Sequence, residues 1–149
     1  MKKKSVLPIL TLVIVVAVSM AIWNPSSQTS LLISSVEIEG VSVNVELAQT
    51  NTERWKGLSG RSTLAEDSGM LFVFKTDGQH GFWMKDMFFP IDIIWINKDE
   101  VVVHVETAVA PESYPNVYEP ILESRYVLEV NAGFSDEHMI SVGDEVSFE

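Results

Sequence analysis

Apolar and aromatic residues are concentrated between Gly69 and Ile96, where polar residues interrupt the chain at only a few places. The Asp77-Gly78 pair in this stretch predicts a tight turn, and Pro90 predicts a corner because proline lacks an amide donor. The apolar segments around them have the length and composition of β-strands. These segments are 70–74, 81–84 and 91–96. The stretch is therefore expected to form the core of the fold.

Apolar and polar residues alternate strictly on both sides of Glu39-Gly40, over 36–39 and 41–47. A period of two on both sides of a glycine predicts a β-hairpin with one buried face. The residues expected on that buried face are Val41, Val43, Val45 and Leu47.

The remaining elements are also short. A helix is predicted to begin at Glu53 after the capping residues 50–52, and Thr63-x-x-Glu66 fits a capping box; an ordered loop fits this part of the chain equally well. Further strands are expected at 101–106, 126–130 and 145–148, and a brief helical excursion at 134–140. Short strands without a long amphipathic helix predict a mainly β fold. We expect one small antiparallel β barrel or sandwich with one or two short helices, over residues 36–149.

The N-terminus has a different character from the rest of the chain. Three lysines, Lys2 to Lys4, precede 18 uncharged residues from Val6 to Trp23. Residues 1–23 therefore predict either a cleaved signal peptide, with Ser19-Met20-Ala21 as the site, or an uncleaved transmembrane helix. Both alternatives put the domain on the extracytoplasmic side, because lysines before such a segment stay in the cytoplasm. Residues 24–35 are rich in serine and predict a flexible tether.

Charge and composition narrow the function classes. The chain has 10 basic and 21 acidic residues, for a net charge of −11, and it has no cysteine. An acidic protein is a poor partner for nucleic acid, and the absence of cysteine excludes a thiol nucleophile and a Cys-ligated zinc. Half of the basic residues nevertheless fall between residues 54 and 85, where they could focus an anionic ligand. These five are Arg54, Lys56, Arg61, Lys75 and Lys85.

Two motifs are candidates for ligand recognition. Trp83-Met84-Lys85-Asp86 places an aromatic face beside two charged groups, as binding clefts do; alternatively, Trp83 belongs to the core and the charges form an ordinary ion pair. Arg54 and Arg61 flank a glycine-containing loop, 57–60, and could hold a carboxylate or phosphate. Alternatively, these arginines bond to carbonyl groups or stack on Trp55.

A third candidate is a set of carboxylates. Asp86 and Asp92, with or without Glu129, could form the acid pair of a glycoside hydrolase. Alternatively, Asp92 caps backbone donors, as a buried aspartate commonly does. The three histidines (His80, His104 and His138) lack zinc-binding spacing, and no nucleotide-binding or hydrolase motif occurs, so no metal or cofactor is expected.

Six blocks of the chain resemble the prokaryotic "domain of unknown function 192" family in residues and in order. They are Arg54-x-x-Gly57-Leu58-Ser59-Gly60-Arg61, 69–74, Phe82-Trp83-Met84-Lys85, 90–96, 127–133 and Gly143-Asp144. The resemblance covers residues 41–149 and implies a small β-rich domain, commonly behind an export signal or membrane anchor, without an assigned activity. The family usually has asparagine where this chain has Asp86, so a role in which that amide donates to a ligand is in doubt.

These observations support three hypotheses of different classes. The first is a membrane-tethered binding module for a small anionic or sugar-like envelope ligand at Arg54, Arg61, Trp83 and Lys85. The second is a hydrolase of envelope material that uses Asp86 and Asp92. The third is a structural or assembly protein that binds an envelope protein through its aromatic region.

Overall fold

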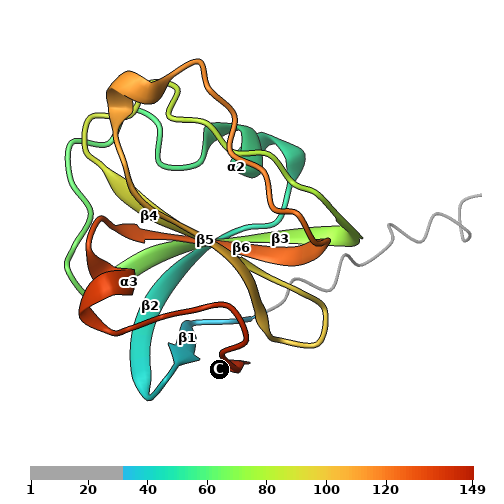
Figure 1. The fold of residues 1–149 in the computed structure, drawn as a ribbon. Coiled ribbons are helices and arrows are strands. Elements are labelled where there is room, and N and C mark those ends of the chain that lie inside the picture. Colours follow the sequence, from blue (N-terminus) through green and yellow to red (C-terminus); the bar gives the residue numbers. More distant parts are fainter. Residues whose placement is uncertain (1–31) are drawn as a thin grey trace, which may run out of the picture. The chain divides into compact units, whose positions relative to one another are not determined.

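The structure is a computed structural model that describes residues 32–149 (Figure 1). Seven strands form one sheet in the order β5-β4-β6-β3-β2-β1-β7. The strands are β1 Ser35–Ile38, β2 Val41–Ala48, β3 Ser68–Gly78, β4 Ile91–Ile96, β5 Val102–Val109, β6 Ser124–Asn131 and β7 Val146–Phe148. The helices in this part of the chain are α2 Asn51–Lys56, α3 Phe134–Glu137 and a 3-10 turn, η1 Pro111–Ser113.

The predicted N-terminal hydrophobic helix, 1–23, lies outside the described residues, as does most of the predicted tether. Within residues 32–149, no helix has the length and apolar character needed to cross a membrane.

The mainly β class is confirmed, but the sheet is mixed rather than purely antiparallel. Strands β2 and β3 pair in parallel, because the chain between them, 49–67, crosses over with α2 before it re-enters the sheet. An isolated bridge between Val101 and Glu145 joins the two edge strands at one end. The sheet therefore curls into a half-barrel (Figure 1).

Some predictions of individual turns, helices and strands are confirmed, and others are wrong. The hairpin at Glu39-Gly40 is confirmed, and Thr50 caps α2 through a capping box with Glu53, although the helix begins at Asn51. The capping box predicted at Thr63-x-x-Glu66 is wrong, because these residues form an irregular loop. The predicted strand 81–84 is also wrong, because Phe82 makes only a single bridge, to Tyr118.

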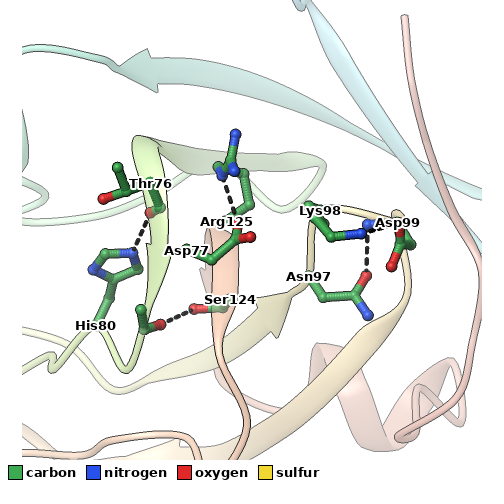
Figure 2. A network of polar contacts seen from close by, with 9 residues as sticks. Thr76, Asp77, His80, Asn97, Lys98, Asp99, Ser124 and Arg125 are labelled. Carbon is green, nitrogen blue, oxygen red and sulfur yellow. Dashed lines mark hydrogen bonds and ion pairs between the residues drawn. The ribbon is translucent and has the colours of Figure 1, made fainter.

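The predicted turn at Asp77-Gly78 is instead the end of β3. Here β6 continues alongside β3, so that Gly78 pairs with Ser124. Arg125 donates to Asp77 over 2.7 Å, and Ser124 donates to the carbonyl of Gly78 (Figure 2). These long-range contacts override the local turn preference.

The sheet is buried on both faces, and successive residues of its central strands alternate between two cores. Met70, Phe72 and Val127 belong to the core on the face that α2 covers, whereas Leu71, Leu128 and Val130 belong to the core on the face that carries α3 (Figure 1). All six residues of β4 are buried. This alternation assigns each polar residue of the central strands to one face.

Gly69 is expected to be intolerant of a side chain. A Cβ there would lie 2.8 Å from the backbone oxygen of Glu129, with two further side chains within 3.2 Å. Since the nearest atom is backbone, we expect Gly69→Ala to lower the free energy of unfolding by about 1–3 kcal/mol. The control is Gly78→Ala, whose closest neighbour is the side chain of His80 at 3.2 Å. Equal denaturant midpoints for the two variants would contradict this expectation.

Candidate functional site

Two of the sequence motifs lie side by side. The amide of Gly60 donates to the carbonyl of Asp86 over 2.8 Å, and the hydroxyl of Ser59 donates to the carbonyl of Lys85 over 2.8 Å. The glycine loop that follows α2 is therefore fixed to the carbonyl groups of Lys85 and Asp86. This contact places α2 and the segment 80–87 next to each other in the wall of one cavity.

The cavity, which we call the aromatic pocket, has a volume of about 520 Å³. Such a volume suits a small molecule. Its walls come from α2 and the loop after it, from β3, from the segment 80–87 and from the loop 117–119, with β6 beneath. The lining residues are Asn51, Arg54, Trp55, Lys56, Gly57, Leu58, Ser59, Phe72, Phe74, His80, Gly81, Phe82, Trp83, Met87, Val117, Glu119 and Glu129.

Three phenylalanine and two tryptophan rings line the pocket. Phe82 packs edge to face against Phe72, with centroids 4.8 Å apart, and against Phe74 at 6.4 Å. Near the surface, Trp83 lies edge to face with Trp55 at 5.5 Å, and these two indoles are 38% and 68% exposed. Exposed tryptophans next to a cavity present a stacking surface that a core does not require.

Glu129 is the only fully buried carboxyl group among the lining residues. It is 5% exposed, and within the described residues its Oε2 has no hydrogen-bond partner. Burial raises the pKa of Glu129 to about 8, although Arg61 acts in the opposite direction. At neutral pH the side chain is thus mostly a protonated acid, which can both donate and accept a hydrogen bond.

The predicted cationic residues occupy different places. Arg54 lines the pocket, where it stacks on Phe74 and donates to the carbonyl of Val73 over 2.8 Å and to Asn51. Lys85 lies beside the pocket, with its Nζ 5.5 Å from the ring centroid of Trp55. Arg61 lies outside the lining and forms a bidentate ion pair with Glu46, whose pKa it lowers.

The two predicted aspartates do not share a cleft with each other. Asp86 is exposed and has a positive φ of 55°, at the turn that follows Lys85. Asp92 is fully buried on β4, and its carboxylate accepts from the amides of Ala108, Gly133 and Ser135. Asp92 thereby caps α3, whose own N-cap is a glycine. This is the alternative that the sequence left open for a buried aspartate.

His80 is held as a structural residue of the pocket wall. Its ring stacks on Phe74 at 3.5 Å, its Nε2 lies 3.2 Å from the carbonyl of Thr76 (Figure 2), and burial lowers its pKa. The carbonyl of His80 also accepts from the indole of Trp95 over 2.8 Å. No cluster of three potential metal ligands occurs in the part of the chain that the structure describes.

Of the residues predicted as a site, Arg54 and Trp83 line the pocket. Trp55, His80 and Glu119 also line it, and the sequence did not predict them as site residues. Glu129 had a visible signal, because it interrupts the apolar strand 126–130 just as Asp92 interrupts 91–96. The sequence alone gave no means of telling which of these acids meets backbone donors and which faces a cavity.

Comparison with known proteins gives a family model and related structures. Residues 34–148 match the model of DUF192, described as "Uncharacterized ACR, COG1430". A protein of unknown function from Novosphingobium aromaticivorans is 30% identical with a TM-score of 0.73, over 83% of this chain and 89% of that one. A protein from Sinorhizobium meliloti, provisionally described as a transcription regulator, is 29% identical with a TM-score of 0.73, over 82% and 98%. No curated protein matches the chain.

Proposed function

The chain belongs to the DUF192 family, and because that family is uncharacterised we propose a function from the pocket itself: the domain binds a small anionic or sugar-like molecule in the aromatic pocket. The observation that carries this proposal is the buried carboxyl group of Glu129, a lining residue of the pocket whose Oε2 has no hydrogen-bond partner within the described residues. A buried carboxyl group with an unmade hydrogen bond is costly, and a ligand that bonds to this carboxyl group would offset part of that cost.

The walls of the pocket fit the same class of ligand. A sugar ring has apolar C–H faces that pack on aromatic rings, and hydroxyl groups that exchange hydrogen bonds with a carboxylic acid. Trp55 and Trp83 supply the aromatic surface at the mouth, and Glu129 supplies the acid beneath. Arg54 and Lys56 add positive charge, which suits an acidic sugar or another small anion.

The proposal locates the domain on the extracytoplasmic side, where residues 1–23 either anchor it or direct its export. The support is the sequence pattern of three lysines followed by an apolar segment. An envelope component is then the expected ligand. The hydrolase hypothesis is not carried further, because the carboxylate of Asp92 is bonded to three backbone amides away from the pocket.

A thermal-shift screen of the full-length protein tests the proposal. The panel contains neutral sugars, their uronic acids, cell-wall fragments and inorganic anions. A ligand that binds only the native state at a hundred times its dissociation constant stabilises the protein by about 2.7 kcal/mol, which raises the melting temperature. We expect this rise to be lost in Trp83→Ala, which removes one wall of the pocket.

The matched control is Phe88→Ala. Phe88 is an aromatic residue that is 69% exposed and does not line the pocket, so its removal should leave the ligand-induced shift intact. A panel without any stabilising compound, or an equal shift in wild type and Trp83→Ala, would contradict the proposed function.

A further inference from the structure

We infer that the ligand presents an anionic oxygen, such as the carboxylate of a sugar acid, to the protonated side chain of Glu129, and that binding therefore depends on the proton that Glu129 holds. This inference rests on the proposed function and specifies both the chemical class of the ligand and its regulation by pH. Three features of the pocket support it: the position of Glu129, the charges around it and the groups that titrate near it.

The position of Glu129 leaves a hydrogen bond unmade. Its neighbours in the sheet are Met70 on β3 and Ile93 on β4, neither of which has a polar side chain. Within residues 32–149, Oε2 has no partner, yet the side chain lines a cavity of about 520 Å³. Neither neighbouring strand offers a polar side chain to Glu129, so the cavity is the side from which a partner can reach its carboxyl group.

The charges around the cavity favour an anion. Arg54 and Lys56 of α2 line the cavity. When Glu129 is protonated, Glu119 is the one negatively charged residue in the lining. Lys85 lies over the ring of Trp55. Arg61 acts on Glu129 electrostatically but is itself paired with Glu46, so it adds no net charge. This local excess of positive charge occurs in a chain whose net charge is −11. Local charge of this sign attracts anionic ligands and disfavours cationic ones.

The proton of Glu129 decides whether the anion is attracted or repelled at the bottom of the pocket. A protonated acid donates a charge-assisted hydrogen bond to a carboxylate, whereas an ionised Glu129 would place two negative charges in contact. No proton needs to leave the pair, because the proton stays shared between the two oxygens.

Glu129 is the group whose titration should control binding. Its pKa is raised to about 8 by burial. The other titratable groups that face the pocket are Arg54, Lys56, His80 and Glu119. Arg61 lies nearby with its ion-pair partner Glu46, which is in register with Met70 and Glu129 across the sheet. Burial lowers the pKa of His80, so this ring is already neutral where Glu129 titrates.

The experiment compares D-glucuronate with D-glucose, which differ only in a carboxylate in place of a hydroxymethyl group. Titration calorimetry on the full-length protein between pH 7 and 10 should give glucuronate an affinity at least about tenfold higher at pH 7, since a hydrogen bond to a charged group is worth about that factor. Above pH 8 the affinity should fall about tenfold per pH unit, as the protonated fraction does.

Two variants distinguish the effect of the Glu129 proton on binding from the effect of the shape of the pocket. Glu129→Gln keeps an N–H donor and should bind glucuronate without a pH transition. Glu119→Gln removes the other acid that lines the pocket and should retain the transition near pH 8. Equal binding of glucose and glucuronate, or an affinity that is flat from pH 7 to 10 in the wild type, would overturn the inference while leaving the proposed function intact. Failure of every sugar and anion in the panel would overturn both.

Discussion

Replacing Glu129 by glutamine is expected to stabilise the protein at alkaline pH and to remove most of the dependence of its stability on pH between 6.5 and 8.5. The folded state raises the pKa of Glu129 from its ordinary 4.5 to about 8. Between these values the folded protein holds a proton that the unfolded chain has released. The free energy of unfolding therefore falls as the pH rises through this range, and it levels off above about pH 9.

The expected size of this effect is large. A shift from 4.5 to about 8 corresponds to about 5 kcal/mol at 1.36 kcal/mol per pH unit. Other titratable groups change the free energy of unfolding in other pH ranges. Hydrogen bonds lower the pKa values of Glu46 and Glu53, so these two groups affect stability below about pH 4.5. Burial lowers the pKa of His80, so this group affects stability below about pH 6.5. Between pH 6.5 and 8 the free energy of unfolding of the wild type should thus fall by about 2 kcal/mol because of Glu129.

Denaturant unfolding at a series of pH values measures this difference. The free energy of unfolding of the Glu129→Gln variant should be nearly constant from pH 6.5 to 8.5, because an amide does not ionise. Glu119→Gln is a suitable control, since Glu119 is an exposed glutamate of the same pocket. Parallel stability curves for the wild type and Glu129→Gln would show that Glu129 ionises normally in the folded protein.

Replacing Asp92 by alanine is expected to be among the most damaging single changes in the domain, with a loss of about 3–5 kcal/mol in the free energy of unfolding. The carboxylate accepts from Ala108 at 2.8 Å, from Ser135 at 2.8 Å and from Gly133 at 3.2 Å. Without it, three amides at a buried site lose their acceptor, and α3 loses its only side-chain cap at the N-terminal end.

Asparagine substitutions give a matched comparison. Asp92→Asn keeps one oxygen of the two and should lose about half as much stability as Asp92→Ala. Asp86→Asn changes the same group at an exposed position, where a positive φ of 55° suits either residue, and should stay within about 0.5 kcal/mol of the wild type. Equal stability of the two asparagine variants would contradict the role assigned to Asp92.

The sequence predicts the local elements of this fold better than their partners. The hairpin at Glu39-Gly40 and the strand 91–96 were predictable because a period of two, or a continuous apolar run between turn residues, is a local signal. The parallel pairing of β2 with β3 was not, because it depends on where the 49–67 crossover returns to the sheet. The same holds for the end of β3, which the pairing of Gly78 with Ser124 extends.

The site illustrates the same limit. An acid within an apolar strand was visible at both Asp92 and Glu129, but the pattern did not indicate their different surroundings. Position along the strand puts Glu129 beside Phe72 and Met70 on the α2 face, whereas Asp92 lies on the α3 face among backbone amides. Trp55 was similarly ambiguous, because only the packing of α2 against the 80–87 segment makes it a pocket wall.

The most direct test of this account is a ¹³C NMR titration of the glutamate carboxyl carbons, with the signal of Glu129 identified by its absence in Glu129→Gln. The account predicts a midpoint near pH 8 for Glu129 in the free protein, and a higher midpoint when glucuronate saturates the pocket, because a bound anion favours the proton. A midpoint near 4.5, with no response to glucuronate, would contradict it.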